Sequence, residues 1–579
     1  MQVRKFIFSG TMVTLMMLTF VLGSHAPLAA APSPQSNIQG PFTITSVKVA
    51  SFDGDVRRLP TLRANAPNVE REAPRPLRRT SAPTVPAPTA PRAPSNQPAA
   101  APVAPRALTS LQNFDGLDRY AGGGWVPPDP NGDVGPNHYI QAVNIALGIY
   151  NKTGAQLAAF SYDALFAGGV APCNTSNYGD PVVLYDAISD RWIAIDFAYY
   201  NSNGPFYECI AVSKSADPVS GGWWLYTVDV SETGAPGVYW FDDYPKLAVW
   251  SDGIYMSANM YNAAGTVFES ARVFAFNRND LINGAPTGLR NVYFNVGGSY
   301  STLLPSNLRG ALPPPGTPSF FASIDEPNSF HLWKFHVTSW GPPVIASFSG
   351  PTDLAVNNFT MPCYGATIQT CVPQLGTTQS VDSLGDRLMM QLQYRNFWGL
   401  ESLWANHTIA ANAAVGYPTG VRWYEIRNPN GSPTVYQQGT FQPDSNYRWM
   451  GSLALDREGN MALGYSVSSA GMYPAIRYTG RMVTDPPGQL SGWEASLIEG
   501  SGSQIGTYGY RWGDYSAMTI DPCDDLTFWY TNEYFSTTSS VWRTRIGSFQ
   551  LGGAPAPPMP RPYVYYFPMV AKNVASGCY

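Results

Sequence analysis

The side chains best suited to chemistry in this sequence are aspartates and arginines that recur at long intervals. Carboxylate oxygens bind hard cations and accept hydrogen bonds from sugar hydroxyls, and an arginine beside a tryptophan offers a cation–π surface to a ligand. If the fold brings these residues together, they form one charged site. The predicted ligand-binding residues are Asp180, Asp243, Asp386, Arg387, Arg448, Arg511 and Asp514.

A structural role is the alternative for both residue types. An aspartate after glycine accepts hydrogen bonds from backbone N–H groups in tight turns. Arg448 and Arg511 each precede a tryptophan, and each could stack on that ring to close its own structural unit. Because a ligand site seldom needs the same pair twice, the sequence favours the structural role, while the ligand site stays open.

Three oxygen-bearing side chains at alternate positions, Asp129, Asn131 and Asp133, look like the start of a calcium loop. The rest of such a loop is missing. Ile140 stands at the twelfth position, where an acidic residue belongs, and the glycine comes fourth instead of sixth. A turn stiffened by proline is favoured over a metal site, and Ca²⁺ is the one cofactor that the sequence suggests.

Cleavage of an extracellular polysaccharide is the enzymatic alternative, by a sialidase-like glycoside hydrolase or by a lyase. Glycosidases need two carboxyl groups roughly 5 to 10 Å apart across the scissile bond, a distance that a sequence does not supply. The 579 residues include only five His, which disfavours histidine-based triads and zinc sites. No nucleophile elbow, phosphate loop or dinucleotide fingerprint occurs in a convincing context.

The charged residues belong to an internal repeat. The motif Arg511–Ser516 (RWGDYS) echoes Arg448–Ser452 (RWMGS) with an offset of 63 residues, and each precedes a short apolar run and an acidic turn. The aligned anchor positions are 133, 180, 243, 386, 451 and 514. The longest interval contains a degenerate unit with the strand-like runs 319–324 and 330–337, so the chain holds about seven units.

The elements that carry these residues are predicted to be strands. Short apolar runs bounded by turn residues, such as Val182–Tyr185, Trp192–Ile195 and Met461–Tyr465, are typical of buried strands. The 54 Gly and 52 Pro interrupt the chain too often for long helices. Strand-type repeats of this length indicate an all-β fold, a single β-propeller of about seven blades, in which matching positions converge at one mouth.

The chain is predicted to have four parts. Residues 1–31 resemble a secretory signal peptide, with a basic start and an apolar stretch that ends near small residues. Residues 32–106 are rich in Pro, Ala and Arg and predict a disordered linker, although Phe42–Ser51 could form strands or join the propeller. Residues 107–551 are the propeller, and residues 552–579 are a C-terminal tail.

Charge and cysteine content limit the partners and the compartment. Residues 1–106 carry a net charge of +8 and the remainder −13, and an acidic body repels nucleic acid. Six cysteines downstream of a leader predict disulfides in a secreted protein. The predicted pairs are Cys173–Cys209, Cys363–Cys371 and Cys523–Cys578.

Several stretches resemble a family of secreted bacterial proteins for which no activity is known. The strongest are Pro127–Tyr139 (PPDPNGDVGPNHY) and Arg511–Ser516, and further matches cover Asp382–Leu388, Gly464–Ser469 and Trp529–Tyr534. The resemblance implies a secreted or cell-surface bacterial protein and carries no catalytic residue with it. The segment Tyr563–Asn573 also looks like a short tail seen on secreted proteins of filamentous green bacteria.

The sequence favours a monomeric binding protein whose propeller mouth holds an extracellular glycan or a protein. It predicts no membrane span after removal of the leader and no nucleic-acid partner. The alternatives are the glycosidase or lyase, which would use the same mouth, and a structural component of the cell envelope.

Overall fold

The computed structural model of the chain divides it into two units, Met1–Gln35 and Ser36–Tyr579. The structure describes residues 37–62, 68–69, 71, 109–363, 370–411, 418–490, 493–507 and 509–552, which all belong to the second unit. The predicted signal peptide lies outside these residues. Within them, strands dominate, and the helices are the short α1 (Tyr162–Leu165), α2 (Arg278–Ile282) and the 3-10 turn η1 (Val56–Arg58). No helix in these ranges is long and apolar enough to cross a membrane.

Across the described residues, the strands form seven antiparallel blades, and in the first six each blade takes four strands in chain order. Blade 1 contains β6 (Asn131–Val134), β7 (His138–Val143), β8 (Ala146–Asn151) and β9 (Gln156–Ser161). Blade 2 contains β10 (Asn177–Asp186), β11 (Arg191–Tyr199), β12 (Phe206–Ser213) and β13 (Trp223–Asp229). Blade 3 contains β14 (Trp240–Val249), β15 (Ile254–Asn262), β16 (Phe268–Phe276) and β17 (Asn291–Asn295).

The remaining blades follow the same order. Blade 4 contains β18 (Leu304–Leu308), β19 (Ser319–Asp325), β20 (Ser329–Ser339) and β21 (Ile345–Ala355). Blade 5 contains β24 (Met389–Phe397), β25 (Leu400–Ala410), β26 (Thr419–Arg427) and β27 (Thr434–Phe441). Blade 6 contains β28 (Tyr447–Leu455), β29 (Met461–Ser469), β30 (Met472–Arg481) and β31 (Ala495–Ile498). Blade 7 contains β32 (Ala517–Ile520), β33 (Phe528–Tyr534) and β34 (Arg543–Gln550).

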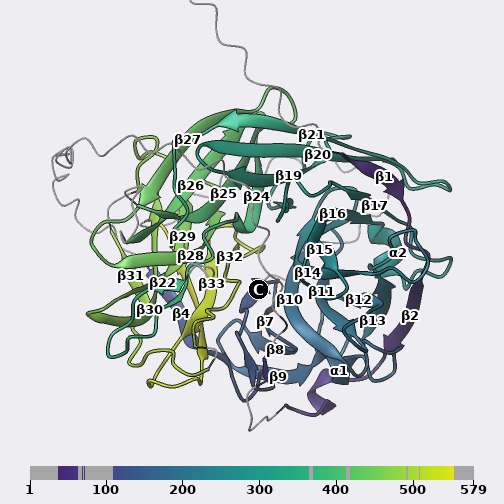
Figure 1. The fold of residues 1–579 in the computed structure, drawn as a ribbon, viewed down its shortest axis with the longest axis horizontal. Helices are drawn as coiled ribbons and strands as arrows, with labels where there is room; N and C mark the ends of the chain where they lie inside the picture. Colours follow the sequence, from purple (N-terminus) through teal and green to yellow (C-terminus); the bar gives the residue numbers. More distant parts are fainter. Residues whose placement is uncertain are drawn as a thin grey trace, which may run out of the picture. The chain divides into compact units, whose positions relative to one another are not determined.

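The ring of blades closes through the start and the end of the propeller segment. Blade 7 takes its fourth strand from β4 (Thr109–Asp118), which pairs with β34 in the register Phe114↔Ile546. The first strand of each blade contacts the first strand of the next, and β32 contacts β6. Figure 1 shows these sheets arranged radially, which confirms the predicted β-propeller. Closure by a strand from the other end of the segment leaves few unpaired edges.

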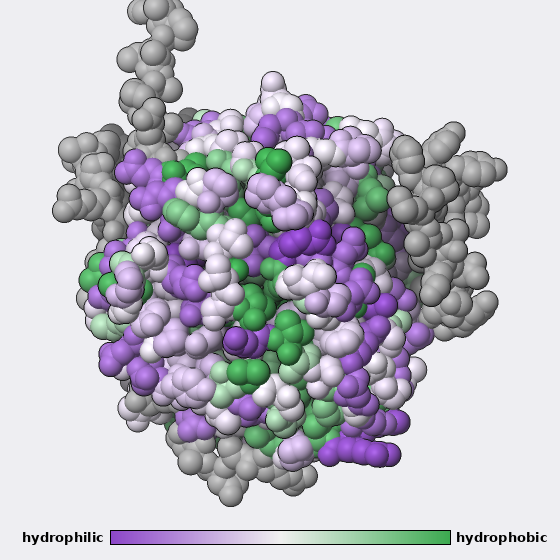
Figure 2. Space-filling view, turned by 90° about the vertical axis from the view of Figure 1, so that its right-hand side faces the viewer, coloured by the Kyte–Doolittle hydropathy of each residue, from purple (hydrophilic) through white to green (hydrophobic). Residues whose placement is uncertain are grey.

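The predicted linker is wrong at its beginning, because two of its segments are strands. β1 (Gln39–Phe42) pairs with β17 and β2 (Val47–Phe52) pairs with β13, so each adds a fifth strand to a blade. Between them Ile44 is buried, and its N–H donates to the side chain of Asn291 (2.7 Å). On the side of the molecule that carries these strands, hydrophobic residues stand among hydrophilic ones (Figure 2). Residues 72–106 of the predicted linker lie outside the described residues.

Four short strands lie between the blades. β3 (Asn68–Val69) pairs with β5 (Trp125–Val126), and β22 (Thr370–Val372) pairs with β23 (Val381–Asp382) in the long connection before blade 5. The core fills the spaces between blades. Strands buried on both faces read as continuous apolar runs, as in β10 and β11, and eight Trp side chains are among the largest that are fully buried.

Candidate functional site

The blade topology brings the predicted charged residues, with the exception of Arg448, to one end of the propeller axis. Because consecutive strands of every blade are antiparallel, all seven first strands begin at the same end. Asp180 and Asp243 lie in the first halves of β10 and β14, and the other residues lie in the connections that lead into β6, β24 and β32. We call this group the axial cluster. It comprises Asp129, Asp180, Asp243, Asp386, Arg387, Arg511 and Asp514, with Tyr244, Lys246 and Tyr515 beneath them.

A left-handed residue marks the start of several first strands. Asp180 and Tyr244 have φ angles of 53° and 54°, each precedes a proline, and the strand register is irregular at each. The two residues are therefore structurally equivalent, whereas the sequence repeat aligned Asp180 with Asp243. The sequence alignment of blade 3 with blade 2 is therefore wrong by one residue. The left-handed residue is the Tyr of Asp-Asp-Tyr in blade 3 and the Asp of Gly-Asp in blade 2. Positive φ in residues other than glycine costs free energy and is common at functional sites.

Two carboxylates of the axial cluster connect neighbouring blades. The N–H of Tyr244 donates to Oδ2 of Asp180 (2.9 Å), and the N–H of Asp514 donates to Oδ1 of Asp129 (2.6 Å). The structural alternative from the sequence has each aspartate accept backbone hydrogen bonds in a tight turn of its own blade, whereas here the N–H donors belong to the next blade. The bonds therefore connect neighbouring blades around the ring.

Two ion pairs of the axial cluster reach solvent. Nε and Nη2 of Arg387 each lie 2.9 Å from an oxygen of Asp386, and the Arg387 guanidinium lies 4.4 Å from the centre of the Tyr244 ring. Nη2 of Arg511 lies 3.5 Å from Oδ2 of Asp514. The side chains of Asp386 and Asp514 are 15% and 16% exposed, and both arginines are 5% exposed. The carboxylates are therefore the accessible members of the two pairs.

Asp243 has a different environment from the other carboxyl groups in the axial cluster. Burial raises its pKa well above the ordinary value, and the carboxylates of Asp180 and Asp514 raise it further. Arg387 and Arg511 oppose this shift without cancelling it. Asp243 therefore holds a proton more tightly than an ordinary aspartate does, and a protonated carboxyl group can donate a hydrogen bond.

Lys246 lies beneath the axial cluster and was missed by the sequence analysis. It is buried on β14, with Nζ 3.1 Å and 3.5 Å from the ring centres of Tyr244 and Tyr515. Nζ also donates to the carbonyl of Pro245 (3.1 Å). Burial lowers its pKa well below the ordinary value, while Asp180 raises it. A single Lys inside the apolar strand 244–249 was the available signal, because lysine is rarely buried without a partner.

Arg448 is not brought into the axial cluster. Its guanidinium lies between Asp444 (2.7 Å) and Glu494 (2.8 Å) and faces the rings of Phe441 and Tyr465 at 5.5 and 6.0 Å. The expected stacking of Arg448 on the adjacent Trp is wrong, because consecutive residues of a strand point to opposite faces. The tryptophans of the two motifs instead pack against each other, with ring centres 5.2 Å apart.

The candidate calcium residues are engaged in contacts between blades. Asn131 Oδ1 accepts the N–H of Val183 (3.0 Å), and Asp133 Oδ2 accepts the N–H of Tyr185 (2.8 Å). Asp133 also accepts the hydroxyl of Thr519 (2.6 Å) and is paired with Arg309. A cation would have to displace these donors, so the residues fit a structural role better than a calcium site. Within the described ranges, no three His, Cys, Asp or Glu side chains are arranged to hold a metal ion.

Other polar side chains continue these inter-blade contacts around the ring. Asn307 of blade 4 accepts the N–H of Val249 in blade 3 (3.0 Å) and donates to Gln391 of blade 5 (2.5 Å). Ser452 of blade 6 donates to the carbonyl of Met390 in blade 5 (2.8 Å). Buried backbone groups that are not paired within a sheet thus form hydrogen bonds with side chains of the neighbouring blade.

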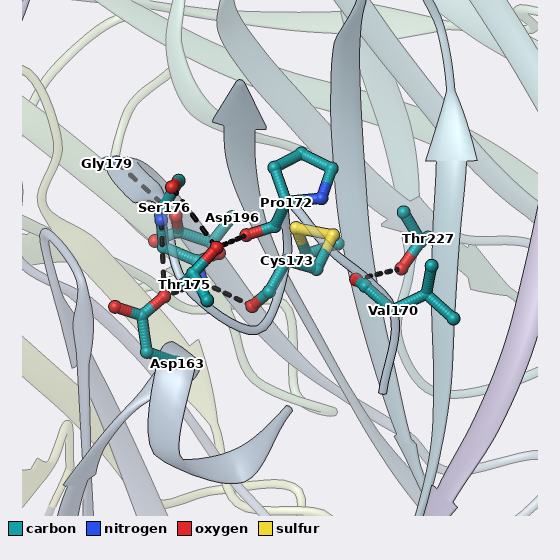
Figure 3. The surroundings of a disulfide bond; sticks show 11 residues. Asp163, Val170, Pro172, Cys173, Thr175, Ser176, Gly179, Asp196 and Thr227 are labelled. Atoms are coloured by element: carbon teal, nitrogen blue, oxygen red, sulfur yellow. Dashed lines mark hydrogen bonds between the residues drawn. A yellow bond between two sulfur atoms is a disulfide. The ribbon is translucent and has the colours of Figure 1, made fainter. Parts of the chain in front are cut away.

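The disulfides hold the connections that lead to the axial cluster. Cys173–Cys209 ties the connection before β10 to β12, and the Val170 carbonyl in the same connection accepts the hydroxyl of Thr227 (3.2 Å), as Figure 3 shows. Cys363–Cys371 closes part of the connection before β24. Both are the pairs predicted from the sequence. Cys523 is disulfide-bonded as well, and its predicted partner Cys578 lies outside the described residues.

A buried group of carboxyls between blades 2 and 3 was also missed by the sequence analysis. Glu208 on β12, Asp242 on β14 and Asp196 on β11 are fully buried. Burial raises the pKa of Glu208 well above its ordinary value and that of Asp242 to about 7. The two carboxyls interact through a hydrogen bond that raises the pKa of Glu208 and lowers that of Asp242, as expected for a proton on Glu208 that is donated to Asp242.

Comparison with known proteins finds no family model and no curated protein that matches this chain. Among solved structures, a thermostable family-43 glycoside hydrolase is similar over 66% of this chain and 95% of its own, with 12% identity and a TM-score of 0.25. The NanB sialidase of Streptococcus pneumoniae covers 71% of this chain and 82% of its own, with 8% identity and a TM-score of 0.31. The phage phi92 endosialidase covers 79% and 71%, with 8% identity and a TM-score of 0.35.

Proposed function

We propose that the protein is an extracellular binding protein whose axial cluster holds a glycan. The observation that carries this proposal is the pair of accessible carboxylates, Asp386 and Asp514, each held by a buried arginine, beside Asp243 with its raised pKa. Each carboxylate presents acceptor oxygens in a fixed position, which suits the hydroxyl groups of a sugar ring. Because the cationic and anionic groups are paired, a neutral glycan fits better than a strongly charged one.

The engagement of the carboxylates favours binding over catalysis. Asp129 and Asp180 are held by backbone amides of the next blade, and Asp386 and Asp514 are held by arginines. Groups fixed in this way recognise a ligand with little loss of side-chain entropy. The two disulfides in the described part of the chain support an oxidising, extracellular location.

A glycoside hydrolase is the second candidate, and Asp243 is the observation that favours it. A general acid needs a raised pKa, and burial together with nearby carboxylates raises the pKa of Asp243. In that function Asp243 would protonate the leaving oxygen, and a carboxylate of the axial cluster would be the second catalytic carboxylate that glycosidases need.

Arg387→Gln tests glycan binding. We would measure the binding of a panel of neutral extracellular polysaccharides to the mature chain by calorimetry, with Arg427→Gln as a matched control from the ion pair with Glu425 on blade 5. Loss of the guanidinium that holds the Asp386 carboxylate in place should weaken binding by about 10- to 100-fold in Arg387→Gln, with no change in the control. The absence of polysaccharide binding by the wild-type chain would refute the proposal and favour a protein partner or a structural role in the envelope.

Asp243→Asn separates binding from hydrolysis, because asparagine keeps the shape of the side chain and its ability to donate a hydrogen bond. For a binding protein, neither the wild-type chain nor the variant releases reducing sugar, and both bind the polysaccharide. For a hydrolase, the wild-type chain releases sugar, and the variant binds the polysaccharide without cleaving it.

A further inference from the structure

A group of large apolar side chains is exposed at the end of the propeller where the first strands finish. Its members, which we call the apolar patch, are Leu312, Trp398, Leu400 and Val483. Trp398 is 71% exposed and Val483 is 57% exposed. Trp398 also occupies the tip of the β24–β25 hairpin with a φ angle of 58°. An exposed Trp in this backbone conformation, with further apolar side chains around it, is typical of a surface that something covers.

Contacts between the loops show that the apolar patch is continuous. The side-chain amide of Asn396 donates to the carbonyl of Leu312 (2.9 Å), which holds the β18–β19 loop against the Trp398 hairpin. A Cβ atom on Gly459 would lie 3.2 Å from Val483 and 3.9 Å from Phe397, so these two side chains flank the same glycine. Leu400 pairs with Phe397 across the hairpin. Blades 4, 5 and 6 therefore contribute to one surface.

The described chain ends beside the apolar patch. Leu551 packs against Gly480, where an added Cβ atom would lie 2.8 Å from it. A Cβ atom on Gly552 would lie 3.5 Å from Met482, the residue before Val483. The tail that begins at residue 553 therefore leaves the propeller at the edge of the patch.

The predicted pairing of Cys523 with Cys578 would bring the far part of the tail back to the same end. Cys523 is disulfide-bonded, and four of the six cysteines are paired with each other, so Cys578 is the remaining cysteine in the sequence. The loop that carries Cys523 is fixed near the patch by Asp525. The Asp525 carbonyl accepts the N–H of Arg457 (2.8 Å), and its carboxylate pairs with Arg395 (2.6 Å), two residues before Phe397.

The tail contains an apolar segment of matching chemistry, Tyr563–Val570 (YVYYFPMV). It begins eleven residues after Gly552 and ends eight residues before Cys578. At about 3.3 Å per residue, the chain can reach roughly 36 Å from Gly552 and roughly 26 Å from Cys578. We propose that Tyr563–Val570 docks on the apolar patch and covers Trp398.

Docking of the tail leaves the axial cluster open. Arg387 precedes β24 and Trp398 follows it, and a strand of nine residues is about 30 Å long. The tail and a glycan would therefore occupy opposite ends of the propeller. The inference does not depend on the proposed glycan binding.

Hydrogen exchange of the mature chain tests this inference. We would compare the wild-type chain with Tyr565→Ser/Phe567→Ser, which changes only the tail, and with Tyr200→Ser as a control. Tyr200 is 56% exposed between β11 and β12. Exchange in peptides that contain Trp398 should become about tenfold faster in the tail variant and stay unchanged in the control. Trp398→Ser should speed exchange in peptides from 563–570 by a similar factor.

Three results would overturn the inference. In the first, exchange around Trp398 is the same in the tail variant and in the wild-type chain. In the second, residues 563–570 of the wild-type chain exchange at the rate of an unprotected peptide, and in the third, the protection of Trp398 disappears on dilution. The last result would show that a second copy of the chain covers the patch.

Discussion

The carboxyl pair Glu208–Asp242 makes the stability of the propeller depend on pH. Both groups are fully buried, and the charged groups that face them are Asp196, Asp229 and Arg272, with Asp180 more weakly coupled. Burial raises the pKa of Asp242 from 3.8 to about 7, so the folded state holds this proton more tightly than the unfolded chain. The stabilising contribution is complete below pH about 4 and is lost as the pH rises through about 7.

The size of the effect follows from the shift of the Asp242 pKa. One pKa unit corresponds to about 1.4 kcal/mol, so a group that titrates at about 7 in the folded state and 3.8 in the unfolded state loses roughly 2 to 3 kcal/mol of stabilisation between pH 5 and pH 8. Asp242→Asn removes the titrating group and keeps its shape. The new amide can donate to Glu208, which favours an ionised Glu208 and reduces the pH dependence further.

Urea unfolding at pH 5 and pH 8 measures this difference. The free energy of unfolding of the wild-type chain should fall between pH 5 and pH 8, and this fall should be smaller in Asp242→Asn by roughly 2 to 3 kcal/mol. Asp444→Asn is the matched control. Arg448 lowers the pKa of Asp444 to about 2, so its contribution changes only at acidic pH, below the range of the assay. An Asp242→Asn variant with the same pH dependence as the wild-type chain would refute the shared-proton interpretation.

Two further perturbations address the contacts that hold the blades together. Replacement of Cys173 and Cys209 by Ser opens a loop of 36 residues, and the loop-entropy relation predicts a loss of about 4 kcal/mol in the free energy of unfolding. The loss would be measured from urea midpoints, and an unchanged midpoint would show that the neighbouring hydrogen bonds hold this connection without the disulfide. Asp133→Asn leaves the buried guanidinium of Arg309 without its carboxylate and should lower the free energy of unfolding by about 3 to 5 kcal/mol, seen as a lower thermal midpoint. A loss below about 1 kcal/mol would contradict the role of Asp133 in holding the blades together.

Repeat spacing predicted the fold class and the approximate number of blades, because each blade uses the same motif where its first strand begins. The same reasoning misplaced blade 3 by one residue. A left-handed bulge at Asp180 and Tyr244 defines the equivalent positions, and bulges insert a residue without leaving a clear signal in the sequence. The strands β1 and β2 were assigned to a disordered linker, because their pairing energy comes from blade edges more than a hundred residues away.

The sequence by itself determined the strand content, the repeat, the disulfide pairs Cys173–Cys209 and Cys363–Cys371, and the residue types that gather on the axis. These depend on local composition, spacing and periodicity. Only the tertiary structure decided which of the charged residues meet. It placed Lys246 against the rings of Tyr244 and Tyr515 and turned Arg448 away from the axial cluster. The pKa of a carboxyl group depends on burial and on charges a few ångströms away in space, and these are set by how the blades pack.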